Sequence, residues 1–88
     1  MTQAAHILIV DDEVIIRSAL VTMLEKKGYH VAGRGTGEEA LQLLEEVRMD
    51  LVITDLRLGP GGGDGMKGVR AARAKPHPPE VVVMTAYG

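Results

Sequence analysis

Four short apolar runs, rich in β-branched residues, constrain the fold more than any other feature of this sequence. They cover residues 6–10, 29–32, 51–54 and 81–84. The first and third are almost continuously apolar and lack the alternation of a strand with one solvated face, so we expect strands covered on both faces, as in a parallel sheet. The second run is the weakest of the four.

Segments with helical periodicity separate these runs. Residues 14–27 predict a first helix that places its charged residues, including Arg17, toward solvent and closes at Gly28. Its expected apolar face consists of Ile15, Ile16, Ala19, Leu20, Met23 and Leu24. Gly33 to Gly35 are expected to turn the chain after the second strand.

Two further helices are expected. Thr36 and Glu39 have the spacing of a capping box at the start of the second helix. The expected apolar face of this helix consists of Ala40, Leu41, Leu43, Leu44 and Val47. Residues 66–74, with Asp64 as a cap, predict a third helix with a thin apolar face.

The resulting order, β-α-β-α-β-α-β, predicts an α/β fold with a doubly wound parallel sheet and right-handed crossovers. In such sheets ligands bind beyond the carboxyl ends of the strands. The polar residues that follow those ends are Asp11, Asp12, Asp55 and Thr85. We therefore expect three carboxylates and one hydroxyl to meet at one edge of the sheet.

This edge has a definite chemistry. Crowded carboxylates repel one another unless a cation lies among them, and an oxygen-only set suits Mg²⁺, or Mn²⁺, better than zinc. A strand-end Asp beside such an ion can act as a nucleophile toward a phosphoryl group. Thr85 could then donate a hydrogen bond to a phosphoryl oxygen. Taken alone, residues 11–13 could equally be acids that favour the start of a helix.

Composition excludes several other classes of protein. With 88 residues the chain can form one domain at most. A net charge of −2 without a basic tract gives no sign that this segment contacts nucleic acid, and the lack of cysteine excludes thiol catalysis and disulfide scaffolds. No apolar run is long enough for a membrane span, and residues 1–5 do not look like a signal peptide. We expect a soluble cytoplasmic protein.

Three stretches in this order, "ILIVDDE", "DLVITDLRL" and "VVVMTAYG", resemble the receiver domain of two-component response regulators. The fold implied by the resemblance is flavodoxin-like. The ending "TAYG" is similar to receivers of transcriptional regulators. The resemblance implies a signalling module, controlled by phosphorylation, rather than an enzyme with turnover.

The resemblance also implies roles for single residues. Asp55 would accept a phosphoryl group from a histidine kinase or a phosphotransfer protein. Asp12 would bind Mg²⁺ directly, with Asp11 helping through the ion or its water, and Asp55 and the backbone carbonyl of Arg57 would complete the protein ligands. Thr85 would be the switch hydroxyl that turns toward the aspartyl phosphate.

The chain departs from the family pattern in two ways. The loop after Asp55 is unusually rich in glycine, with Gly59 and Gly63 at positions where the family has Pro and Gly. The resemblance spans residues 1–88 but only about the N-terminal three-quarters of the family's five-stranded domain, without the last strand, its Lys and the last helices. We expect a fragment of a longer regulator, whose strand 81–84 is an exposed edge open to self-association.

Two alternatives remain open. A truncated or degenerate scaffold would keep the fold without switching, and it predicts no stable aspartyl phosphate. An aspartate-nucleophile phosphohydrolase usually carries a second Asp two residues after the nucleophile. Here Arg57 occupies that position, which argues against the second alternative.

Overall fold

The computed structural model describes residues 4–55, 70 and 72–84. The elements in these residues are, in order, β1 (His6–Val10), α1 (Val14–Lys26), β2 (His30–Arg34), α2 (Gly37–Glu46), β3 (Leu51–Asp55) and β4 (Glu80–Met84). Within the described part of the chain, no helix combines the length and apolar character that crossing a membrane requires.

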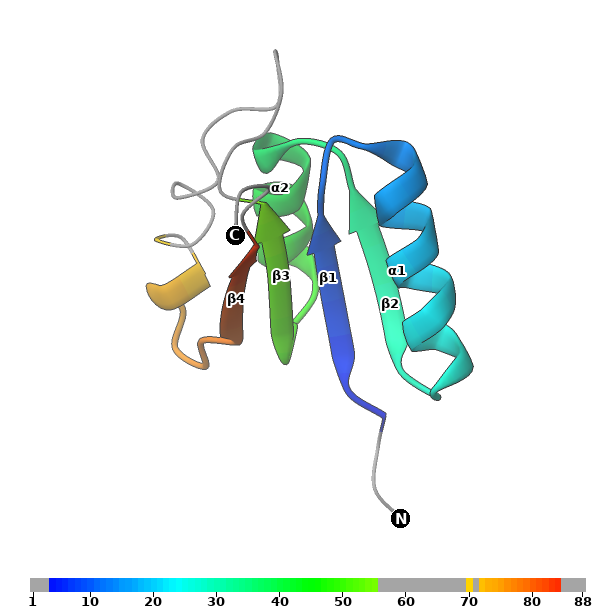
Figure 1. Ribbon diagram of the computed structural model, residues 1–88. Helices are drawn as coiled ribbons and strands as arrows, with labels where there is room; N and C mark the ends of the chain where they lie inside the picture. Colours follow the sequence, from blue (N-terminus) through cyan, green and yellow to red (C-terminus); the bar gives the residue numbers. More distant parts are fainter. Residues whose placement is uncertain (1–3, 56–69, 71, 85–88) are drawn as a thin grey trace.

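The strands form one sheet in the order β2-β1-β3-β4, and each neighbouring pair is parallel (Figure 1). Residues 7–10 of β1, a central strand, are buried on both faces of the sheet, in agreement with their continuous apolar character. The predicted parallel sheet is confirmed. All four carboxyl ends therefore lie at the same edge of the sheet.

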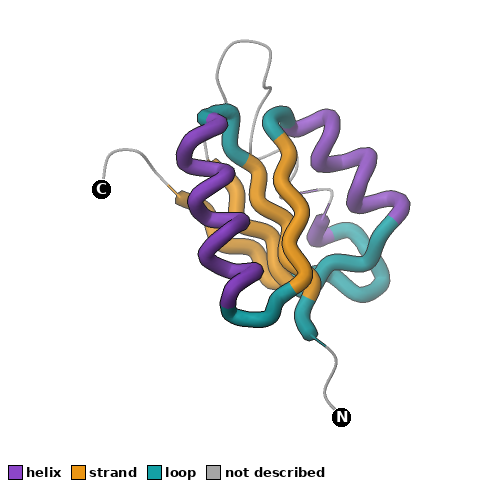
Figure 2. Tube along the Cα trace, turned by 90° about the vertical axis from the view of Figure 1, so that its right-hand side faces the viewer, coloured by secondary structure: helices purple, strands orange, loops and turns teal. Residues whose placement is uncertain are grey.

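The two helices cover opposite faces of the sheet (Figure 2). The main buried cluster lies between the sheet and α2 and includes alternate residues of the central strands, as the two-residue period of a strand requires. Its members are Leu8, Val10, Ala40, Leu44, Met49, Val52 and Ala72. Ile7 and Ile9 are the alternate residues of β1 and point to the opposite face, where both are buried.

The predicted cap of α2 is confirmed. The Glu39 N–H donates to Thr36 Oγ1 at 3.1 Å, and the Thr36 hydroxyl donates to Glu39 Oε1 at 3.2 Å. These bonds satisfy a first-turn donor and fix the point at which the helix begins. Ala40 and Leu44 on its inner face are buried as expected, while Val47 lies beyond its last turn and is 37% exposed.

The predicted orientation of α1 is confirmed for Leu20 and Leu24, which are half-buried, and wrong for Ile15 and Arg17. Ile15, which was expected to face inward, is 84% exposed, and Arg17, which was expected to face solvent, is half-buried. The half-buried residues of α1 are Arg17, Leu20, Val21 and Leu24. Apolar residues surround most of this helix, so their periodicity does not select one face.

The other boundaries need smaller corrections. β2 continues to Arg34, two residues beyond its predicted end, and β4 begins at Glu80 instead of Val81. Of the predicted third helix, residues 70 and 72–73 are helical, and most of the remainder lies outside the described residues.

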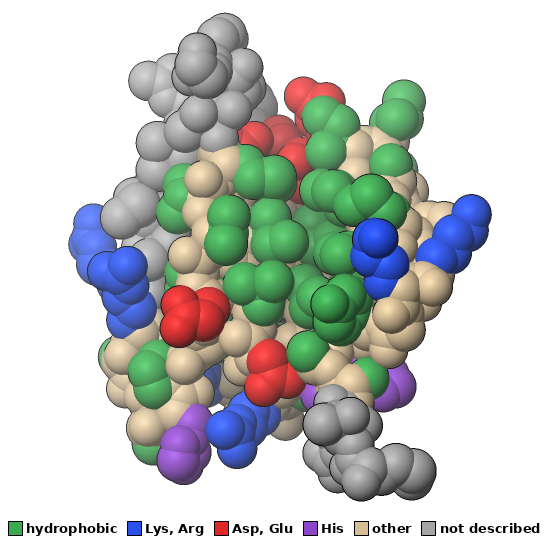
Figure 3. Space-filling view, turned by 60° about the horizontal axis from the view of Figure 1, so that its bottom comes forward, with side chains coloured by type: hydrophobic (Ala, Val, Ile, Leu, Met, Phe, Trp, Pro, Cys, Tyr) green, Lys and Arg blue, Asp and Glu red, His purple; other side chains and the backbone are tan. Residues whose placement is uncertain are grey.

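Hydrophobic side chains gather on one face of the molecule (Figure 3). The exposed large residues of α1 and β4 include Ile16, Met23, Val82 and Val83. β4 is the last strand in the order of the described sheet, with β3 as its neighbour. The self-association expected at this edge stays a prediction.

Candidate functional site

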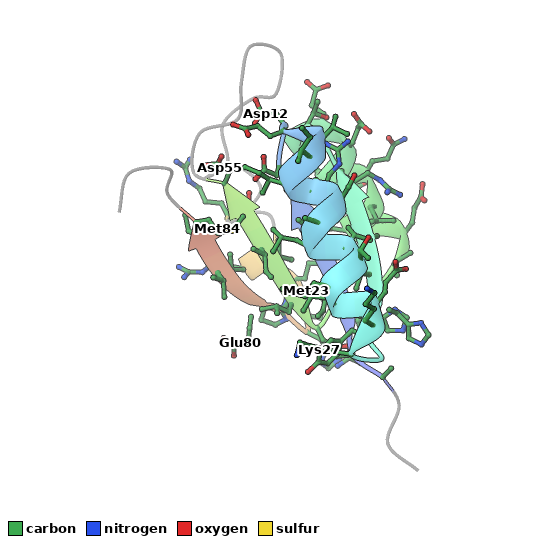
Figure 4. The ribbon with its side chains drawn as sticks, turned by 45° about the vertical axis from the view of Figure 1, so that its right-hand side comes forward. Asp12, Met23, Lys27, Asp55, Glu80 and Met84 are labelled. Carbon is green, nitrogen blue, oxygen red and sulfur yellow. The ribbon has the colours of Figure 1, made fainter. Side chains whose placement is uncertain are left out.

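Three carboxylates meet at the carboxyl edge of the sheet. Asp11 and Asp12 follow β1, and Asp55 ends β3, the neighbouring strand, whose Thr54 pairs with Val10. One carboxylate oxygen from each Asp lies within 4.8 Å of the others. Figure 4 shows Asp12 and Asp55 at the same end of the sheet, opposite the end with Lys27 and Glu80.

The three acids differ in burial. Asp11 is 4% exposed, Asp55 is half-buried, and Asp12 is exposed. One oxygen of Asp11 accepts a hydrogen bond from the Glu13 N–H at 2.9 Å, just before the start of α1. The cluster is therefore anchored in the protein at Asp11 and opens to solvent at Asp12.

Charge makes this arrangement costly without a cation. Like charges a few ångströms apart repel by about 1 kcal/mol in water and by more where water is partly excluded. The positive end of the α1 dipole, which starts beside the acids, lowers that repulsion. The oxygen-only donor set, partly buried and at this spacing, fits a hard divalent ion such as Mg²⁺.

Arg17 supports this edge, a role that the sequence did not suggest. Its Nη1 donates to the backbone carbonyl of Asp11 at 2.6 Å. The side chain lies over Gly33 in β2 and over Gly35 just after it: a Cβ at Gly33 would lie 3.1 Å from Arg17 Cγ, and one at Gly35 would lie 3.0 Å from Nη1. Glycine in a strand often marks the close approach of another group. Gly33 is thus the one feature of the sequence that points to the position of Arg17.

Replacement of Arg17 by Ala should lower the free energy of unfolding by about 1.5–3 kcal/mol, because a hydrogen bond from a charged donor is lost together with the packing of the stem. Urea denaturation followed by circular dichroism measures this change. Lys26→Ala, an exposed cation on the same helix, is the control and should cost less than about 1 kcal/mol. Equal losses in the two variants would contradict the supporting role of Arg17.

Thr54 also fixes the end of β3. It is 5% exposed, and its hydroxyl donates to the backbone carbonyl of Asp55 at 3.1 Å. Two residues predicted for the site, Arg57 and Thr85, lie outside the described residues. The structure therefore brings together Asp11, Asp12 and Asp55 of the predicted set.

Comparison with known proteins agrees with this geometry. The family model for the response regulator receiver domain matches residues 7–88. The chain belongs to the response regulator receiver family. Its sheet order, β2-β1-β3-β4, is that of the flavodoxin-like fold, as the sequence predicted.

Alignments with individual relatives extend over almost the whole chain. It is 37% identical over 84 residues to the transcriptional regulatory protein PdtaR of Mycobacterium tuberculosis, covering 93% of this chain and 39% of that protein. It is 35% identical over 82 residues to sporulation initiation phosphotransferase F of Bacillus subtilis, covering 93% of this chain and 64% of that protein. The chain thus spans less than two thirds of both relatives.

A solved structure is similar in fold and sequence. Response regulator protein TrrA of Thermotoga maritima, in complex with Mg²⁺–BeF, has a TM-score of 0.83 and 34% identity. The match covers 96% of this chain and 71% of TrrA.

Proposed function

We propose that this receiver domain accepts a phosphoryl group on Asp55 from a histidine kinase or a phosphotransfer protein, with Mg²⁺ bound beside it. The observation that carries the proposal is the convergence of Asp11, Asp12 and Asp55 at one edge of the sheet. Phosphorylation would then bias the domain toward a state that an output domain or partner recognises.

The three acids would bind the metal ion together. Asp11 and Asp12 would hold Mg²⁺ together with Asp55, and by the family resemblance the backbone carbonyl of Arg57 would add a further oxygen. When bound, Mg²⁺ would neutralise charge on the oxygens of the transferred group. The complex of TrrA with Mg²⁺–BeF supports this choice of ion.

Asp55 would supply the nucleophile. One of its carboxylate oxygens forms a bond to phosphorus while the phosphorus–nitrogen bond to the donor imidazole breaks, and the imidazole leaves with that electron pair. The phosphoryl group stays on the protein, so the domain acts as a signalling module and not as an enzyme with turnover. Thr85 keeps the role of switch hydroxyl that the resemblance implies.

The output is proposed from the relatives. PdtaR and the AfsQ1 protein of Streptomyces coelicolor are both called transcriptional regulatory proteins. We propose that this domain likewise controls transcription, in the cytoplasm, through a further part of its parent protein. We also propose that residues 1–88 are the N-terminal three-quarters of the receiver domain.

Mg²⁺ binding can be tested with two neighbouring acids. Mg²⁺ should raise the melting temperature of the wild-type chain, because a ligand that binds only the folded state stabilises it. Asp12→Asn should weaken Mg²⁺ binding by about tenfold or more, since it removes one of the charged ligands. A titration of melting temperature against Mg²⁺ concentration gives both affinities.

Glu13→Gln is the matched control for this titration. Glu13 is the next residue and is exposed, but it is not part of the carboxylate cluster. It should keep the wild-type response to Mg²⁺. If both variants lose the response to Mg²⁺ equally, the ion is attracted by the overall negative charge and not by a specific site. A wild-type response in Asp12→Asn would overturn the proposed ion site.

A further inference from the structure

Two histidines lie side by side at the edge of the sheet opposite to the acids. His6 begins β1 and His30 begins β2, and the two are direct partners in the parallel register. Their ring centroids are 4.9 Å apart, the ring planes are inclined by 22°, and both residues are exposed. Their position is set by strand pairing, so the backbone holds the two imidazoles together.

Adjacent positions on paired strands suit two ligands of one metal ion. Neighbouring strands lie about 4.8 Å apart, and a tetrahedral Zn²⁺ ion with bonds of about 2.0–2.1 Å to each imidazole nitrogen requires those nitrogens to be about 3.3 Å apart. The stacked rings must turn about their side-chain torsions until one nitrogen of each points to a shared centre. Exposure of both side chains leaves room for that rotation.

The neighbouring charge also favours a cation. Asp50, the residue just before β3, lies beside His6, and its Oδ2 accepts a hydrogen bond from the His6 N–H at 2.8 Å. This bond fixes the backbone at the start of β1 and holds the Asp50 carboxylate against the His6 main chain. The carboxylate lowers the local potential without any requirement that it binds the ion.

We propose that His6 and His30 form a binding site for a late first-row divalent ion, such as Zn²⁺, through one imidazole nitrogen each, with water completing the shell. Imidazole nitrogens suit Zn²⁺, Ni²⁺ and Cu²⁺, whereas the carboxylates at the opposite edge suit Mg²⁺. The two sites are therefore separated by ligand chemistry as well as by the length of the strands. The inference does not depend on the proposed phosphoryl transfer.

Binding would join the starts of β1 and β2. The ion would stabilise the folded chain over the unfolded one, because only the folded sheet holds the two imidazoles next to each other. We expect one Zn²⁺ per chain and a higher melting temperature in its presence.

The three histidines of the chain allow a matched test. Calorimetric titration with Zn²⁺ is compared for the wild type, His6→Ala, His30→Ala and His77→Ala. His77 is also exposed but lies in the segment before β4, away from the strand pair. Loss of either paired histidine should weaken binding by about tenfold or more, as expected for a lost ligand, and His77→Ala should bind like the wild type.

Other results would overturn the site. Equal affinities in all three variants would show that Zn²⁺ binds elsewhere or to an unfolded chain, and a loss in His77→Ala alone would move the site to that residue. The same titration with Asp12→Asn separates the histidine pair from the acid cluster. Unchanged Zn²⁺ affinity in Asp12→Asn supports the pair, and a loss there contradicts it.

Discussion

Replacement of Asp55 by Asn should abolish phosphorylation of this chain. Incubated with Mg²⁺ and a small acyl phosphate, the wild type should gain one labile phosphoryl group, which intact-mass spectrometry detects directly. The side-chain amide introduced by Asp55→Asn lacks the anionic oxygen that attacks phosphorus, so the adduct should fall to background. Without Mg²⁺ the wild type should also remain unmodified.

Asp50→Asn is the matched control for this experiment. Asp50 precedes the opposite end of β3, and its contact is an accepted hydrogen bond from the His6 N–H, which an amide oxygen can keep. This variant should be phosphorylated like the wild type. An adduct of equal size in Asp55→Asn would place the acceptor elsewhere, and a folded wild-type chain without any adduct would favour the scaffold that does not switch.

Leu8→Ala should have the largest effect on stability. Leu8 is fully buried at the centre of β1 and belongs to the cluster between the sheet and α2. Removal of its side chain should cost about 2–5 kcal/mol, the lost transfer energy plus the cavity. Whole domains are stable by only about 5–15 kcal/mol. The variant should therefore unfold at a much lower urea concentration than the wild type, or be largely unfolded without urea.

Ile15→Ala provides the comparison for Leu8→Ala. Ile15 is of similar size and apolar, but it lies on α1 with 84% of its surface exposed. Its replacement should change the free energy of unfolding by less than about 0.5 kcal/mol. Urea denaturation followed by circular dichroism measures both. A large loss in Ile15→Ala would mean that this face of α1 is covered, and an unchanged midpoint in Leu8→Ala would contradict the position of the core.

The sequence predicted the sheet and the cluster of acids for a simple reason. Strands buried on both faces must be apolar along their whole length, so residues 6–10 and 51–54 stand out without knowledge of their partners. Once the strands are parallel, the residues after them share one edge. The meeting of Asp11, Asp12 and Asp55 therefore followed from strand position alone, and the structure confirms it.

Only the tertiary structure determined the orientation of α1 and the side chains that support the carboxyl edge of the sheet. Apolar residues lie on most sides of α1, so the choice between Ile15 and Arg17 as the inward residue depends on the surface of β2. Gly33 and Gly35 leave the space that Arg17 fills, and its guanidinium reaches the carbonyl of Asp11. The contacts of Arg17 with Gly33 and Gly35 join residues that are 16 and 18 positions apart, and no local pattern records them.

The histidine pair illustrates the same limit. His6 and His30 are separated by 24 positions in the sequence, but the register of β1 with β2 makes them direct neighbours. Local preference and hydrophobic period determine which segments become strands and where those strands end. Which side chains then face each other depends on register and packing, because these are set by the free energy of the whole folded chain.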